Sequence, residues 1–476
     1  MRIAFITFFK PGYGGGVGQI AHEIAHYFSR YHDVALIYPA GKQGQHQEDR
    51  LQVFGLPSAG EGDLSIPVVT AATLHRLFTF LDDFKPDVIH AHEPTPLDLF
   101  GQIWARQHTV PFVHTAHVLP SKVLDFGGGE AIRLMRTALA QTITQEFLQE
   151  FYGNCDAIIA LNDAAEQDLR AFGYQGRIFK IPNGRDLERY AACRLADPAE
   201  PEKLLTFIGY LSQRKNQAYL LDVLAHLPPA YKLQLIGDPL NPRDERDIRE
   251  KIAALGLEER VLLIPRQPHE RIPAYLERTH VFVSASKMEV QSLVIIEALA
   301  SGTPVVGLSN ETIDELVNDE VGKWLPKDTP PEVFAQAVEA IATLAPEAYH
   351  ALCLCARRRV QHLDWSNVMA QTIAAYEILI REQKNVTPQQ HNTLRRAIRL
   401  MPRGELRGML WHYLMRVEKL LPQAVPVRKL QAAQRVHNRS WMFMVLALPA
   451  SWIGSLLLGL LKLSQRARKA SRPGKP

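Results

Sequence analysis

Residues 204–226 read LLTFIGYLSQRKNQAYLLDVLAH. The apolar-rich residues 204–208 predict a buried strand, a glycine turn follows, and a helical pattern begins at Gln217. A buried strand that runs through a glycine turn into a helix is typical of doubly wound α/β sheets. Because the preceding residues 191–203 are rich in Ala, Pro and charge, we expect a second domain to begin here.

The same alternation extends over most of the chain. Strands are expected at residues 3–7, 34–38, 88–91, 112–115, 157–161 and 178–181, and again at 204–208, 232–236, 261–264, 281–284 and 304–307. Helices are expected at residues 19–29, 74–84, 164–172, 217–226, 244–255 and 294–300, with consecutive helices over 330–384. The sequence therefore predicts an α/β fold of two Rossmann-like domains facing a cleft, over residues 1–190 and 191–384, with a basic helical tail at 385–476.

The length of 476 residues exceeds what one hydrophobic core usually supports, which agrees with two domains and an extension. The cysteines Cys155, Cys193, Cys353 and Cys355 fit neither a zinc site nor a disulfide framework, so we expect a reducing compartment. The N-terminus MRIAFITFF predicts a first buried strand and no signal peptide.

A glycine-rich stretch, GYGGGVG at residues 12–18, lies between the first expected strand and the first expected helix. Glycines here let the backbone approach a phosphate or a sugar, and the helix N-terminus favours negative charge. A nicotinamide dinucleotide site is disfavoured, because no G-x-G-x-x-G frame fits and the second strand, ending near Tyr38, carries no acidic residue for a ribose. The remaining alternative is a turn without a ligand.

Two glutamates, Glu289 and Glu297, flank a predicted junction between a loop and a helix. Glu289 is expected before the helix, where it can accept hydrogen bonds from sugar hydroxyls, and Glu297 within it, where it can accept from ribose hydroxyls. The first amides of the helix, at Ser292, Leu293 and Val294, can bind phosphate. Two glutamates alone are more often surface charges, but the apolar sequence around this pair and the SGTPVV strand entry that follows favour a site.

Arg214 and Lys215 follow the first strand of the second domain. A cation at a strand end in the cleft can neutralise a leaving diphosphate without a metal. The alternative is a solvated pair at the start of a helix.

Four histidines, His90, His92, His114 and His117, are expected at two neighbouring strand ends. They raise the possibility of a metal site, but no carboxylate or cysteine cluster completes it. We expect hydrogen-bonding roles in a polar cleft, and no metal.

Together these motifs resemble the retaining GT-B glycosyltransferases, a family that includes phosphatidylinositol mannosyltransferases and diacylglycerol glucosyltransferases. The resemblance covers residues 1–384 and rests on the E-x₇-E spacing, DVIHAH at 87–92, PFVHTAH at 111–117 and PNGRD at 182–186. It implies that catalysis is front-face displacement. Because no acidic D-x-D-type motif is expected in the cleft, we also expect no metal requirement. The resemblance assigns roles to five positions: Glu297 for the donor ribose, Glu289 for the transferred sugar, Lys215 for the diphosphate, Gly16 near sugar and phosphate, and His117 for the sugar and acceptor.

One position departs from the family pattern. The family usually has arginine where this chain has Tyr210, so either Arg214 supplies that charge from the next turn or the site has one cation fewer.

The tail differs in charge from the rest of the chain. Residues 391–476 contain 17 Lys and Arg but 2 Asp and Glu, and residues 441–461 carry no charge. This apolar segment includes Trp441 and Trp452 and is interrupted by Pro449 and Gly454. Basic residues flank it on both sides, among them Arg439, Lys462, Arg466, Arg468 and Lys469.

Because both flanks of the apolar segment are basic, we expect it to insert shallowly into an anionic membrane surface. The alternatives are a single crossing that keeps the enzyme cytoplasmic, and a buried helical hairpin in a soluble oligomer. Nucleic acid is disfavoured, because no aromatic residues alternate with the charges.

The sequence therefore predicts a hexosyltransferase that uses a nucleotide-sugar donor, UDP-glucose-like or GDP-mannose, and a membrane lipid acceptor at the cytoplasmic face. One alternative is transfer to a polysaccharide or a polyprenol-linked glycan. Another is a non-catalytic protein that binds nucleotide-sugar, which Tyr210 favours. A sugar 2-epimerase on the same scaffold is disfavoured, because that function would not explain a membrane-binding tail.

Overall fold

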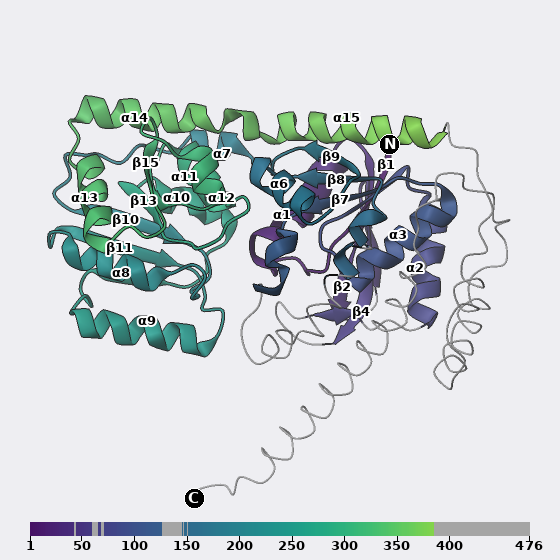
Figure 1. Ribbon diagram of the computed structural model, residues 1–476, viewed down its shortest axis with the longest axis horizontal. Coiled ribbons are helices and arrows are strands. Elements are labelled where there is room, and N and C mark those ends of the chain that lie inside the picture. Colours follow the sequence, from purple (N-terminus) through teal and green to yellow (C-terminus); the bar gives the residue numbers. More distant parts are fainter. Residues whose placement is uncertain are drawn as a thin grey trace, which may run out of the picture.

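The computed structural model describes residues 1–41, 44–59, 65–67, 71–125, 145, 147–149 and 151–384. They form two α/β lobes that lie side by side (Figure 1). The basic tail, with the apolar segment at 441–461 and its flanking residues, lies outside the described residues. Within the described part of the chain, no helix is both long enough and apolar enough to cross a membrane.

The N-terminal lobe is built on a sheet in the order β3-β4-β2-β1-β6-β7-β8-β9, with β5 paired to β4. Its strands are β1 (Arg2–Ile6), β2 (Asp33–Gly41), β3 (Gly44–Glu48), β4 (Leu51–Ala59), β5 (Ile66–Pro67), β6 (Val88–Ala91), β7 (Phe112–Ala116), β8 (Ala157–Ala160) and β9 (Arg177–Lys180). The pairs of β4 with β3 and with β5 are antiparallel, and the other pairs are parallel. Strand β1 lies between β2 and β6, so the sheet order reverses at its carboxyl end, where α/β sheets bind ligands.

The C-terminal lobe repeats this plan with a parallel sheet in the order β12-β11-β10-β13-β14-β15. Its strands are β10 (Lys203–Ile208), β11 (Tyr231–Ile236), β12 (Val261–Ile264), β13 (Val281–Ser284), β14 (Val305–Leu308) and β15 (Gly322–Leu325). The order reverses at β10, between β11 and β13. The loops after β10 and β13 contain Lys215 and Glu289, so the predicted site residues lie where the fold places ligands.

Helices cover both faces of each sheet. In the N-terminal lobe, α2 (Ala71–Phe84) and α3 (Pro96–His108) cover one face, and α1 (Gly15–Ser29) covers the other. In the C-terminal lobe, α8 (Gln217–His226), α9 (Pro242–Leu255) and α13 (Pro331–Ala342) cover one face. The other face is covered by α7 (Leu187–Ala191), α10 (Ile272–Leu276), α11 (Leu293–Ser301) and α12 (Glu311–Leu316). The remaining elements are α6 (Asp163–Ala171), α14 (Pro346–Arg359), η1 (Pro120–Asp125), η2 (His269–Arg271) and η3 (Gln361–Leu363).

The last described helix, α15 (Trp365–Lys384), returns from the C-terminal lobe and runs along the N-terminal lobe (Figure 1). Its residues Trp365, Val368 and Tyr376 are buried in the same core as Ile3 and Phe5 of β1. The chain therefore crosses between the lobes twice, once before α7 and once before α15.

The predicted doubly wound architecture is confirmed, and the expected strands and helices lie within a few residues of the observed ones. Sequence reasoning did not identify the strands β3, β4, β5 and β15 or the helices α3, α7, α10 and α12. For α3 a local signal was present, because Thr95 and Asp98 form a capping box and Pro96 lies in the first turn.

Candidate active site

The glycine-rich loop follows β1 and ends in helix α1. Gly14 has a left-handed backbone with φ of 79°, and a Cβ there would lie 2.2 Å from the ring of Phe9, so this position requires glycine. Before this loop, Thr7 Oγ1 and Phe8 N donate hydrogen bonds to the Glu93 carboxyl group at 3.1 Å and 2.8 Å. These contacts fix the start of the loop at the carboxyl end of β1.

Helices α1 and α11 approach each other at their N-termini across the lobes. A Cβ on Gly15 would lie 3.1 Å from the Tyr210 ring, and a Cβ on Gly16 would lie 3.4 Å from Leu293 Cδ1. No side chain caps either helix, at Gly14 or at Ser292. Two uncapped helix N-termini in contact form a place where an anion is favoured.

Lys215 and Glu289 form an ion pair beside this junction. Their side chains are 12% and 10% exposed, so the two charges are shielded from bulk water. Burial makes the pair costly to break, but a bound diphosphate and sugar can replace each partner. The structure thus brings together the predicted cation and the predicted sugar-binding carboxylate.

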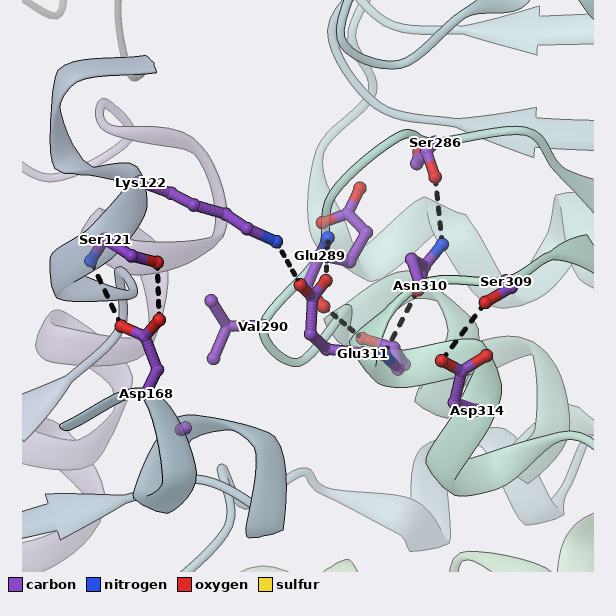
Figure 2. A network of polar contacts seen from close by, with 12 residues as sticks. Ser121, Lys122, Asp168, Ser286, Glu289, Val290, Ser309, Asn310, Glu311 and Asp314 are labelled. Atoms are coloured by element: carbon purple, nitrogen blue, oxygen red, sulfur yellow. Dashed lines mark hydrogen bonds and ion pairs between the residues drawn. The ribbon is translucent and has the colours of Figure 1, made fainter. Parts of the chain in front are cut away.

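Polar contacts from both lobes hold the loop that contains Glu289 (Figure 2). Glu289 N donates to Glu311 Oε2 at 3.1 Å, and Glu311 pairs with Lys122 of the N-terminal lobe. Asn162, also of the N-terminal lobe, donates through Nδ2 to the carbonyl oxygen of Val290 at 2.7 Å. The position of Glu289 therefore depends on the arrangement of the two lobes.

The helix start after this loop matches the prediction only in part. Leu293 begins α11 next to Gly16, as expected for a phosphate-binding amide. The Ser292 amide, however, donates to Thr312 Oγ1 at 2.8 Å, so this amide is engaged within the protein. Val294 follows in the first turn. The Arg214 backbone oxygen accepts from Lys287 N at 2.9 Å and its side chain is half-buried, so its predicted role at the phosphates stays a prediction.

Glu297 lies within α11, as predicted, and is buried. Its Oε1 is 2.9 Å from Arg185 Nε and 2.8 Å from His269 Nε2, and Arg185 also pairs with Glu23 of α1. Burial by itself raises the pKa of Glu297, but the charge of Arg185 and the hydrogen bond from His269 outweigh it, so the pKa is lowered from its ordinary value. Sequence reasoning identified Glu297 and missed the partners Arg185 and His269.

Three of the four predicted histidines form a buried cluster at the ends of β6 and β7. His92 Nδ1 is 2.9 Å from His117 Nε2, and His90 lies 2.5 Å from the Tyr376 hydroxyl and 2.6 Å from Thr115 Oγ1. All three rings line a cavity between the sheet, α1 and α15. Burial lowers the pKa of His90 and of His117 to about 3, so both rings are neutral at physiological pH.

The fourth histidine is not in the cleft, so its predicted hydrogen-bonding role there is wrong. Side chains alternate along β7, and His114 points to the opposite face from Thr115. Its ring packs 5.2 Å from Phe151 and 5.5 Å from Tyr152, between centroids. Among the residues that the structure describes, no group of three or more His, Cys, Asp or Glu side chains could hold a metal ion.

The buried histidines predict a loss of stability in acid. The unfolded chain binds a proton at His90 below about pH 6.5, whereas the folded chain binds it only near pH 3, so the free energy of unfolding falls as the pH falls between these values. This site alone contributes a slope of up to about 1.4 kcal/mol per pH unit. In denaturant titrations from pH 7 to pH 4, His90→Gln should reduce the slope, and the control His226→Gln, at an exposed histidine, should not. Equal slopes for wild type and His90→Gln would contradict this assignment.

Two family models match this chain in succession: "Glycosyltransferase Family 4" over residues 14–189 and "Glycosyl transferases group 1" over residues 196–352. The chain belongs to the glycosyltransferases of the GT-B fold. It is a hexosyltransferase, which favours catalysis over the non-catalytic alternative. The two matches meet between residues 189 and 196, near the boundary expected from the sequence.

Curated relatives of this glycosyltransferase are moderately similar. D-inositol 3-phosphate glycosyltransferase of Geodermatophilus obscurus is 28% identical over 316 residues, covering 62% of this chain and 67% of that protein. The GDP-mannose-dependent alpha-(1-6)-phosphatidylinositol dimannoside mannosyltransferase of Mycobacterium tuberculosis is 25% identical over 393 residues, covering 79% and 95%. Among solved structures, sucrose-phosphate synthase of Thermosynechococcus elongatus matches with a TM-score of 0.66 at 21% identity. The match covers 80% of this chain and 100% of that chain. At this identity the similarity supports the fold alone.

Proposed function

We propose that this GT-B glycosyltransferase moves a hexose from a nucleotide-sugar to a membrane lipid, with retention of anomeric configuration. The observation that carries the proposal is the meeting of two uncapped helix N-termini beside the Lys215–Glu289 pair. The amides near Gly16 and Leu293 suit a diphosphate, Lys215 offsets the charge of the leaving group, and Glu289 can hold the sugar. Glu297 binds the ribose of the donor in this proposal. Its ionised carboxylate contacts His269 in the structure, so the ribose hydroxyls must replace His269 when the nucleotide binds.

The lipid acceptor is supported by two independent features. Curated relatives carry names that refer to phosphatidylinositol dimannoside and to phosphatidyl-myo-inositol. The chain also carries the basic and apolar tail at residues 391–476. A basic surface next to an apolar segment binds anionic membranes, so we place the enzyme at the cytoplasmic face, where nucleotide-sugars are made.

The mechanism that we propose is front-face displacement. The bond between the anomeric carbon and the diphosphate oxygen breaks first, which gives a sugar with oxocarbenium character. The acceptor hydroxyl forms the new bond on the same face, and its proton passes to the departing phosphate oxygen. The neutral His117 can donate a hydrogen bond to the sugar or the acceptor, and the cation Lys215 takes the place that a metal fills in other enzymes, so we expect no metal requirement.

Transfer assays with extracted lipids test this function. Purified full-length protein is incubated with radiolabelled UDP-glucose or GDP-mannose and total lipid extract, in parallel reactions with and without EDTA. We expect label to enter the organic phase with one of the two donors, and to enter it about 10²–10³-fold more slowly with a Lys215→Met variant. Label on soluble or polyprenol-linked glycans would identify the alternative acceptors and contradict the lipid assignment, and activity that disappears in EDTA would contradict metal independence.

A further inference from the structure

Arg185 lies where the chain crosses between the lobes. It follows β9, and its backbone N donates to the Leu363 carbonyl oxygen at 2.9 Å, while Trp365 N donates to the Arg185 carbonyl oxygen at 3.0 Å. These bonds join the outgoing crossing before α7 to the returning crossing before α15. Arg185 is therefore fixed where the two crossing segments meet.

The side chain of Arg185 is one of the largest fully buried side chains in the described residues, at 1% exposure. It contacts a carboxylate of each lobe: Glu23 on α1 and Glu297 on α11. Burial of a guanidinium carries a large desolvation cost unless ionised partners surround it. Glu23 and Glu297 belong to opposite lobes, so both can surround the guanidinium only while the lobes keep their present relative positions.

We propose that Arg185 is a positioning residue for the donor, which holds the Glu297 carboxylate in place for the ribose hydroxyls and links it to Glu23 of the N-terminal lobe. This inference rests on the proposed function, because it takes Glu297 as the ribose-binding group. The arrangement lets nucleotide binding at Glu297 affect the contact that joins the two lobes. Arg185 does not itself touch the donor, so it acts through Glu297.

The charges around Glu297 explain why Arg185 is needed. Arg185 approaches from the crossing segment, His269 from η2 and Tyr190 from α7, and Glu23 lies on the far side of Arg185. Of these groups, only the guanidinium is a permanent cation. Without it, burial and the nearby Glu23 raise the pKa of Glu297, and the protonated carboxyl accepts hydrogen bonds less well.

The test measures the ratio of two dissociation constants, one for a nucleotide with the 2′ and 3′ hydroxyls of its ribose and one for the analogue that lacks them. Calorimetry compares UDP and GDP with their 2′,3′-dideoxy analogues at pH 6 and pH 8, so that titration of the phosphates cancels in the ratio. We expect wild type to bind one of the two nucleotides at least about tenfold more tightly than its analogue at both pH values, since hydrogen bonds to a charged group are worth about that factor.

An Arg185→Met variant should lose most of this preference at pH 6 and recover part of it at pH 8, as Glu297 ionises. The matched control is Arg177→Met. Arg177 is an exposed arginine outside the cleft, and its ion pair with Glu382 measures 2.8 Å. This control should keep the full preference for the ribose hydroxyls. Thermal unfolding establishes that each variant is folded. An unchanged preference in Arg185→Met at both pH values would overturn the proposal.

Wild type alone keeps the proposal testable if Arg185→Met does not fold. Because Arg185 keeps Glu297 ionised, the preference of wild type should stay constant from pH 8 to pH 6, and a preference that falls in this range would overturn the proposal. Failure of wild type to bind either UDP or GDP would instead refute the proposed function, together with the inference built on it.

Discussion

A Lys215→Met variant is expected to lower kcat by about 10²–10³-fold, the usual effect of removing one preorganised group that stabilises developing charge. Lys215 follows β10 at the reversal of the sheet order, beside the facing starts of α1 and α11. Tyr210, an uncharged residue, lies beside Gly15 at the start of α1, so the loss of Lys215 should remove a large share of the positive charge at the diphosphate. Because that charge grows as the sugar leaves, the effect on kcat should exceed the effect on donor binding.

Initial rates with saturating donor, together with calorimetry of UDP and GDP, measure this effect. Lys232→Met is the matched control, since Lys232 pairs with Glu202 at 2.6 Å on the surface of the same lobe. The control should transfer sugar as fast as wild type. Wild-type rates in Lys215→Met would show that the ion pair with Glu289 is only structural and that another cation serves the diphosphate.

Much of the fold could be predicted because its central strands are parallel and buried on both faces. Such strands are continuous apolar runs, and β6 and β13 were placed at their observed bounds. The strands that were missed differ in pattern. β3 is fully exposed and reads GQHQE, and β4 contains Gly55 and Pro57, so neither has the apolar run that identifies a buried strand.

The predicted site residues were found where each follows a strand, because the ends of parallel strands meet at one edge of a sheet. This places Lys215 and Glu289 together at one edge of the C-terminal sheet, and Gly16 at the corresponding edge of the N-terminal sheet, without any knowledge of contacts between the lobes. Contacts between residues far apart in sequence could not be predicted in this way. Arg185 and Glu23 are 162 residues apart and belong to no shared motif, and PNGRD offers no sign that its arginine is buried.

A Glu289→Gln variant is expected to lower kcat about as much as the loss of Lys215, by about 10²–10³-fold, but with the opposite effect on nucleotide binding. The amide keeps the size of the side chain and removes its charge. The carboxylate is then missing where positive charge develops on the sugar ring, which slows transfer. Lys215 loses its partner and faces the diphosphate alone, so UDP or GDP should bind as tightly as to wild type or more tightly.

This divergence between rate and affinity separates a sugar-binding role from a structural one. Glu202→Gln is the control, because it removes the carboxylate of the exposed pair with Lys232 and should change neither quantity. If Glu289 served only to hold its loop, the loss of its charge would disturb the neighbouring contacts of Glu311 and Val290, and nucleotide affinity would fall together with kcat. A parallel loss of both, with a lowered melting temperature, would therefore contradict the assignment of Glu289 to the transferred sugar.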